Sequence, residues 1–105
     1  MVIIIETGIY IRVSTEEQAQ NGYSIRAQME KLSVYSRIKD WNVIDFYIDE
    51  GISGKNISER KELIRLIEDI KAKKVNNVLV YKIDRLTRST KDLIELVELF
   101  NKYNC

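Results

Sequence analysis

The chain has 105 residues, the length of one small domain with its own core. It is 45% apolar and 31% charged, as soluble globular proteins are, and its 17 basic and 16 acidic residues leave a formal charge of +1, so contact with a polyanion requires a local cluster of cations. A single cysteine, Cys105, and the lack of histidine argue against a disulfide-bonded secreted fold and a His/Cys zinc site, and favour a reducing cytoplasm.

Strand-like and helix-like segments alternate along the chain. Continuous apolar runs indicate buried strands, and apolar residues spaced three and four apart indicate helices. In chain order they predict a strand at about 8–13, a helix from Ser24 to Lys39, a strand from Trp41 to Ile48, a loop from Glu50 to Ser58, a helix marked by Leu63, Leu66, Ile67 and Ile70, a strand from Asn77 to Ile83 and a last helix opening at Ser89. Ser89-Thr90-Lys91-Asp92 has the spacing of a capping box. The alternation predicts an α/β fold, three layers α/β/α around a mostly parallel sheet of strand order 2-1-3.

Chemically active side chains follow the predicted strands. Ser14 ends the first strand, Asp49 follows the second, and Asp84-Arg85 follows the third. The carboxyl edge of a parallel sheet is where ligands bind in such folds. The sequence therefore predicts an active site at this edge, with a serine nucleophile facing a phosphodiester.

Arg12 strengthens the case for Ser14. A serine near a strand end is most often a turn former or a helix cap. Arg12, however, lies two positions earlier on the same strand, so both side chains point to the same face. An arginine on a strand buried on both faces is costly unless it binds an anion, and a guanidinium beside a hydroxyl suits attack on phosphorus.

Further cations can join this site. Arg85 and Arg88 are three residues apart, so if 85–88 form a helical turn or a tight loop they project together, with Asp84 able to orient one of them. Arg60 lies near the start of a helix that Ser58 is expected to cap, where the helix dipole disfavours a cation. Each has a purely structural alternative. Residues 84–88 can be a solvated surface segment with an Asp–Arg ion pair, and Glu59 and Glu62 can offset the charge of Arg60.

Gln28 falls on the apolar face of its helix, between Ile25 and Leu32. It is either a buried polar residue with a structural partner or a member of the site. The segment Gly51-Ile52-Ser53-Gly54-Lys55 lacks both the six-residue frame and the Ser or Thr after lysine of a phosphate-binding loop, which excludes that motif.

Taken together, these segments resemble the catalytic domain of the serine site-specific recombinases, the resolvase/invertase family. The resemblance runs from about residue 8 to the end, and its Gly-Tyr-Ser-Ile segment is most similar to the large serine recombinases of integrase and transposase type. Its motifs are Tyr10-Ile11-Arg12-Val13-Ser14-Thr15-Glu16-Glu17-Gln18, Gly22-Tyr23-Ser24-Ile25-Arg26-Ala27-Gln28, Asp49-Glu50-Gly51-Ile52-Ser53-Gly54, Arg60 and Tyr81-Lys82-Ile83-Asp84-Arg85-Leu86-Thr87-Arg88.

The resemblance implies cleavage and rejoining of DNA strands through a 5′-phosphoserine intermediate on Ser14, with no metal and no cofactor. It implies that arginines neutralise the transition state, that two aspartates hold arginines and loops in place, and that two glutamines bind near the scissile phosphate. The arginines are Arg12, Arg60, Arg85 and Arg88, the aspartates are Asp49 and Asp84, and the glutamines are Gln18 and Gln28. The general base for Ser14 is left open.

The family continues into a further strand, a long helix that builds dimers and tetramers, and DNA-binding domains. We therefore expect residues 1–105 to be the N-terminal catalytic domain of a longer recombinase, inactive when isolated, with DNA as its substrate.

The sequence leaves two alternatives to a recombinase. A non-catalytic interaction domain on a recombinase scaffold is one. A receiver-type signalling domain is the other, although it needs an acidic pair where this chain has Arg12 and Ser14.

Overall fold

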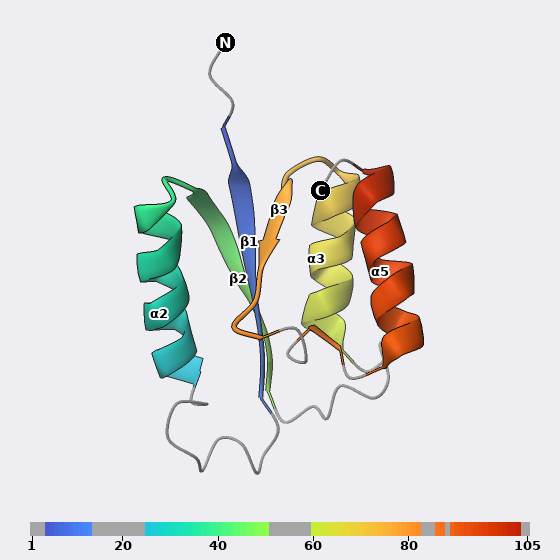
Figure 1. The fold of residues 1–105 in the computed structure, drawn as a ribbon, viewed down its shortest axis with the longest axis horizontal. Coiled ribbons are helices and arrows are strands. Elements are labelled where there is room, and N and C mark those ends of the chain that lie inside the picture. The colour runs from blue at the N-terminus through green and yellow to red at the C-terminus, as the bar shows by residue number, and fades with distance from the viewer. Residues whose placement is uncertain (1–3, 14–24, 51–59, 83–85, 88, 104–105) are drawn as a thin grey trace.

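The computed structural model describes residues 4–13, 25–50, 60–82, 86–87 and 89–103. Strands and helices alternate within these ranges, as the sequence predicted (Figure 1). In chain order they are β1 (Glu6–Val13), α2 (Ile25–Ile38), β2 (Asn42–Glu50), α3 (Lys61–Lys71), β3 (Asn77–Leu79) and α5 (Thr90–Lys102). None of these helices is both long and apolar enough to cross a membrane.

The sheet has the order β2-β1-β3, and both pairings of β1 are parallel. This confirms the predicted strand order. The register places Arg12 of β1 beside Asp49 of β2, with one irregularity between Thr7 and Gly8. The first strand is therefore the central one, and its last residues lie next to the last residues of β2.

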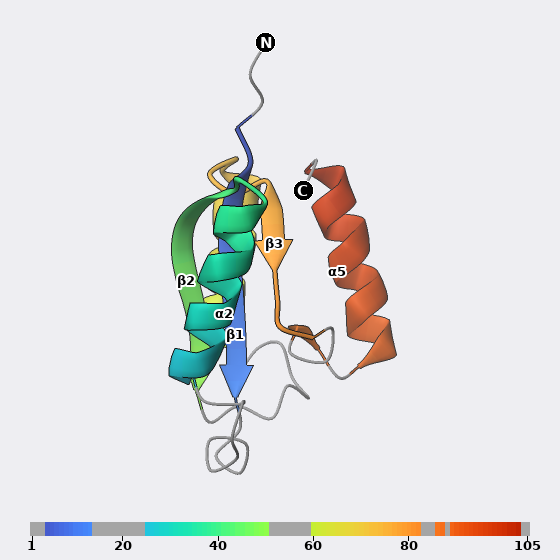
Figure 2. The same ribbon diagram turned by 60° about the vertical axis from the view of Figure 1, so that its left-hand side comes forward.

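Helices cover both faces of the sheet. Figures 1 and 2 show α2 on one face and α3 with α5 on the other. Side chains of β1 alternate between the two: Ile9 and Ile11 pack with Leu32 of α2, whereas Tyr10 packs in the larger cluster beneath α3 and α5. The predicted three layers are thus confirmed.

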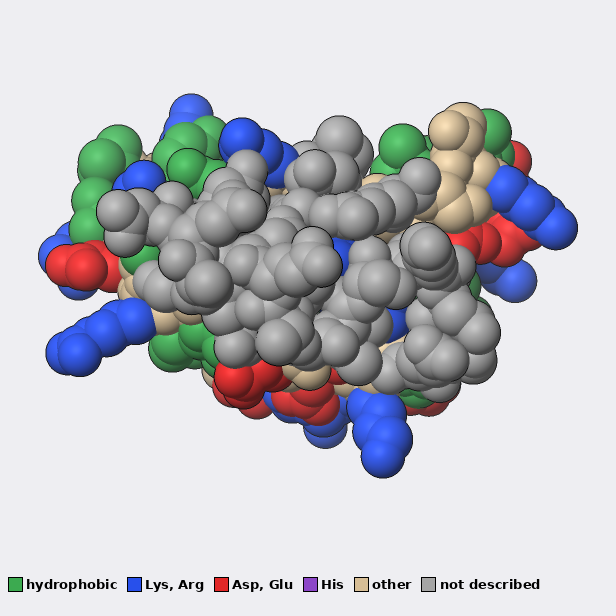
Figure 3. Space-filling view, turned by 90° about the horizontal axis from the view of Figure 1, so that it is seen from below, with side chains coloured by type: hydrophobic (Ala, Val, Ile, Leu, Met, Phe, Trp, Pro, Cys, Tyr) green, Lys and Arg blue, Asp and Glu red, His purple; other side chains and the backbone are tan. Residues whose placement is uncertain are grey.

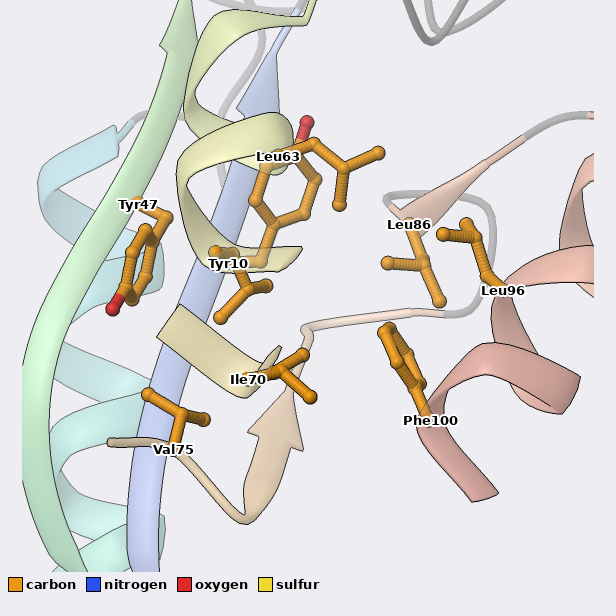
Figure 4. Close-up of a cluster of buried hydrophobic side chains, with 9 residues drawn as sticks. Tyr10, Tyr47, Leu63, Ile70, Val75, Leu86, Leu96 and Phe100 are labelled. Atoms are coloured by element: carbon orange, nitrogen blue, oxygen red, sulfur yellow. The ribbon is translucent and has the colours of Figure 1, made fainter. Parts of the chain in front are cut away.

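The larger cluster joins β1, β2, α3 and α5 into one core. Figure 4 shows Leu86 between Leu63 of α3 and Leu96 of α5. Its buried members are Tyr10, Tyr47, Leu63, Leu66, Ile70, Val75, Leu86, Leu96 and Phe100. The residues that follow β3 are therefore tied to the core through Leu86.

The ends of several elements differ from those expected, and β2 runs two residues beyond its predicted end at Ile48. The strand predicted at 77–83 ends at Leu79, and β1 begins at Glu6, two residues earlier than predicted. The N-cap position of α3 is Arg60, and Ser58 lies outside the described residues. The cap of α5 is as predicted, because Ser89 Oγ accepts a hydrogen bond from the Asp92 amide at 3.3 Å.

Candidate active site

The carboxyl ends of the strands and the first turns of the helices lie at one end of the molecule. Figure 1 shows β1, β2 and β3 pointing to the end at which α2, α3 and α5 begin. Viewed onto this end, Lys and Arg side chains project around the rim, beside Asp and Glu side chains (Figure 3). Of the residues singled out from the sequence, the structure describes Arg12, Gln28, Asp49 and Arg60, whereas Ser14, Gln18, Asp84, Arg85 and Arg88 lie outside the described residues.

Arg12 is fully buried on the central strand. It lies two residues after Tyr10, so its side chain leaves the sheet on the face that α3 covers. Its neighbour across the parallel ladder is Asp49. A guanidinium is thus buried next to the strand that carries a carboxylate, close to the end of the sheet.

Asp49 is buried and accepts three hydrogen bonds. The Tyr10 hydroxyl donates to Oδ2 at 2.7 Å. The backbone amide of Glu62 donates to Oδ1 at 3.1 Å, and that of Leu63 donates to Oδ2 at 3.1 Å. Because those amides belong to the first turn of α3, the carboxylate of β2 caps this helix and complements its dipole.

Arg60 is also fully buried, and its guanidinium points into the protein. Its Nε donates to the Tyr10 hydroxyl at 3.0 Å, its Nη2 donates to the carbonyl of Leu86, and its Cζ lies 5.2 Å from the centre of the Tyr10 ring. Nη1 has no hydrogen-bond partner among the described residues. The sequence placed Arg60 at a phosphate, whereas these contacts connect it to β1 and to the segment before α5.

Tyr10 links the carboxylate to the guanidinium. Its hydroxyl donates to Asp49 and accepts from Arg60. Burial raises the pKa of Tyr10 well above its ordinary value, and the Arg60 charge offsets only part of that rise. The phenol therefore stays protonated at neutral pH and remains a donor to Asp49.

Gln28 comes from the other side of the sheet. It is fully buried on α2, the helix that packs over Ile9 and Ile11, so its placement on the apolar face is confirmed. The structure thus gathers Arg12, Asp49 and Arg60 on the α3 face, while Gln28 lies in the helix that covers the opposite face.

Sequence reasoning missed Tyr10 and the Leu86 carbonyl as parts of this arrangement. The sequence gives Tyr10 no role beyond its place in the strand and in the first motif. A buried tyrosine needs a partner for its hydroxyl, and Tyr10 lies two residues before Arg12 on the same face, which was a usable signal. A backbone carbonyl carries no sequence signal at all.

Metal ligation in proteins commonly uses histidine, cysteine, aspartate and glutamate side chains gathered at one place. The described ranges contain no group of three or more such side chains that could hold a metal ion.

Solved structures with a similar fold include catalytic domains of recombinases. The N-terminal catalytic domain of TP901-1 integrase is 45% identical with a TM-score of 0.86, over 94% of this chain and 73% of that one. The C-terminal catalytic domain of ISC1926 TnpA, an IS607-like serine recombinase, is 31% identical with a TM-score of 0.82, over 95% and 66%. A resolvase family site-specific recombinase from Streptococcus pneumoniae is 34% identical with a TM-score of 0.78, over 95% and 68%.

Curated relatives match shorter parts. The chain is 62% identical over 50 residues to the "uncharacterized immunity region protein 3" of Bacillus phage phi105, covering 48% of this chain and 61% of that protein. It is 45% identical over 80 residues to a putative DNA recombinase of Bacillus subtilis strain 168, covering 76% of this chain and 15% of that protein. The chain thus spans less than two thirds of the length of either relative.

The family model described as "Resolvase, N terminal domain" matches residues 7–105, which include every element of the fold except the first residue of β1. The chain therefore belongs to the resolvase N-terminal domain family.

Proposed function

We propose that this protein cleaves and rejoins DNA strands in site-specific recombination, as the catalytic domain of a serine recombinase. The observation that carries the proposal is the burial of Arg12, Arg60 and Asp49 at one end of a parallel sheet. Arg12 lies on β1, the strand that Ser14 follows in sequence. Arg12 and Asp49 are neighbours across the ladder there. Membership of the resolvase N-terminal domain family supports the same reaction.

In the proposed reaction, Ser14 is the nucleophile. Its Oγ forms a bond to phosphorus, the bond from phosphorus to the 3′ oxygen breaks, and the serine proton is balanced by the proton that the released 3′-hydroxyl takes up. One phosphoester replaces another, so rejoining can proceed by the reverse attack without an energy source. Two strands cut in this way can exchange before they are rejoined.

The other residues have supporting roles in this proposal. Arg12, Arg85 and Arg88 neutralise charge on the transition state, Asp84 orients the arginines, and Gln18 and Gln28 hydrogen-bond near the scissile phosphate. Asp49 holds the start of α3 in place. DNA is the proposed partner, and a dimer or tetramer of the full-length protein brings two cleaved sites together.

A covalent adduct is the test. The full-length protein is incubated with labelled target DNA and run on a denaturing gel, where the wild type gives a slow protein–DNA band. Ser14→Ala removes that band while DNA binding and the unfolding midpoint stay unchanged. The matched control is Ser33→Ala, which alters a serine on α2, away from the proposed site, and keeps the band. An adduct that persists in Ser14→Ala assigns the nucleophile elsewhere.

A second candidate is a non-catalytic interaction domain on a recombinase scaffold; the chain is also 62% identical over 50 residues to a phage "uncharacterized immunity region protein". If the wild-type protein binds DNA or a recombinase but gives no adduct with any target DNA, this candidate replaces the first.

A further inference from the structure

Arg60 is braced inside the protein. Its side chain is fully buried, two of its three nitrogens donate to protein oxygens, and its guanidinium lies over the Tyr10 ring. The contacts run from Asp49 through the Tyr10 hydroxyl to Arg60 and on to the Leu86 carbonyl. We call this chain of contacts the Arg60 brace. It joins β2, β1, the start of α3 and the segment before α5.

We propose that Arg60 is a positioning residue that fixes the segment around Leu86, and that it does not contact the DNA phosphate. The proposal rests on the proposed function, because the segment matters for cleavage only if Arg85 and Arg88 are catalytic. Leu86 follows the first of these arginines directly and precedes the second by two residues. Fixing its carbonyl therefore constrains the backbone that carries both.

The surroundings of Leu86 fit this role. Its side chain is buried in the core cluster between Leu63 and Leu96, and the next residue, Thr87, is buried as well (Figure 4). Its carbonyl is bound by a charged donor, the stronger kind of hydrogen bond. Packing on one side and the Arg60 brace on the other hold the segment at two points.

The rival role is direct contact through the remaining nitrogen. Nη1 of Arg60 has no hydrogen-bond partner in the described part of the chain, so a phosphate oxygen is its conceivable acceptor. The two roles differ in what Tyr10 should do. If Arg60 positions the segment, Tyr10 matters because it holds the guanidinium in place. Tyr10 cannot act on DNA itself, because its hydroxyl proton is already donated to Asp49 and the oxygen accepts from Arg60.

Single-turnover cleavage by the full-length protein separates these roles. Tyr10→Phe and Arg60→Met are each compared at saturating DNA, alone and combined. A displacement of about 1 Å at a catalytic group lowers a rate by about 100-fold. We expect both single variants to slow cleavage by that order with unchanged DNA affinity and full reaction amplitude, and the double variant to be no slower than the slower single one. A merely structural defect would lower the amplitude, and Tyr10→Phe cleaving at the wild-type rate would overturn the proposal.

The matched controls come from a similar arginine–tyrosine pair, Arg65 of α3 and Tyr47 of β2. Arg65 lies over the Tyr47 ring at 4.1 Å and donates to the Phe46 carbonyl at 3.1 Å, while the Tyr47 hydroxyl bonds Asp69. Arg65→Met and Tyr47→Phe therefore remove the same kinds of contact outside the brace. They should cleave at the wild-type rate.

A neutral phosphate tests direct contact independently. A methylphosphonate at the scissile position removes the charge that a contacting arginine would neutralise. If Arg60 only positions the segment, the Arg60→Met variant stays impaired on this substrate. Restoration of its cleavage toward the wild-type rate would assign Arg60 to the phosphate and overturn the proposal.

Amide hydrogen exchange tests the brace without using activity. The amides of Ser89, Asp92 and Leu93 are hydrogen-bonded just after the braced segment. Arg60→Met should accelerate their exchange by roughly tenfold, and Arg65→Met should not. Unchanged exchange in Arg60→Met refutes the brace. The two proposals can fail separately. If the wild type forms no adduct but exchange is accelerated in Arg60→Met, the proposed function is refuted and the Arg60 brace is supported.

Discussion

Removing the carboxylate of Asp49 should destabilise the fold far more than removing a neighbouring carboxylate on the same strand. Asp49→Ala leaves three donors without their acceptor: the Tyr10 hydroxyl and the amides of Glu62 and Leu63. A buried donor left unpaired costs at least about 1 kcal/mol, and loss of a helix cap costs a similar amount. We therefore expect a loss of about 3 kcal/mol in the free energy of unfolding.

For a domain of this size, 1 kcal/mol corresponds to about 4–8 °C in the unfolding midpoint, so the expected decrease is roughly 12–24 °C. Circular dichroism on heating measures it. The matched control is Asp45→Ala on β2, whose side chain is 51% exposed and paired with Arg65, because an exposed pair contributes about 1 kcal/mol or less. Midpoints for Asp49→Ala and Asp45→Ala that agree within a few degrees would refute the reasoning about the cap.

Three further predictions concern packing, capping and pH. A Cβ on Gly8 would lie 2.8 Å from Leu66 Cδ1, so Gly8→Ala should lower stability by about 1–3 kcal/mol in urea unfolding, and an unchanged midpoint would contradict the close approach. Ser89→Ala removes the α5 cap and should cost about 1 kcal/mol in the same assay, with Ser89→Asp restoring it. The pKa of Asp45 is lowered, chiefly by its hydrogen bond from Arg65, so this carboxylate stabilises the folded state above its unfolded pKa and stops doing so as the pH falls through its folded pKa. Stability measured from neutral to acidic pH should therefore fall less for Asp45→Asn than for the wild type, by a small and salt-sensitive margin.

The layered fold was predictable because its signals are local. The three-and-four spacing of apolar residues marked α2, α3 and α5, and the cap at Ser89 was readable from four consecutive residues. The order of the strands followed from the alternation of strand and helix. These features depend on periodicity and short-range chemistry, which a single sequence contains.

The ends of β1 and β3 were not predictable, because they depend on pairing between residues far apart in the sequence. Only three residues of β3 pair with β1, starting where Asn77 lies beside Thr7, although the apolar run continues to Ile83. Val80 and Tyr81 after it still pack against the two core clusters, so burial persists where pairing stops. Hydrophobicity reports burial, and it does not report which backbone groups find a partner.

The site was predictable as a set of residues and not as a set of contacts. Arg12 and Asp49 were expected at one edge, and the ladder places them side by side. The cap of α3 comes from Asp49, a side chain thirteen residues away, and Arg60 reaches Leu86, twenty-six residues away. Such partners become visible only when the chain has been folded.

The central position of β1 has a consequence for how the chain folds. β1 leaves the ribosome before both of the strands that flank it, and the hydrogen bond between Asn77 and Thr7 closes a separation of 70 residues. Pairings this distant along the chain delay folding, because much chain entropy is lost before they form. Until β3 has been synthesised, one edge of β1 stays open to other chains, so the interval between the synthesis of β1 and that of β3 is the period in which aggregation competes with folding.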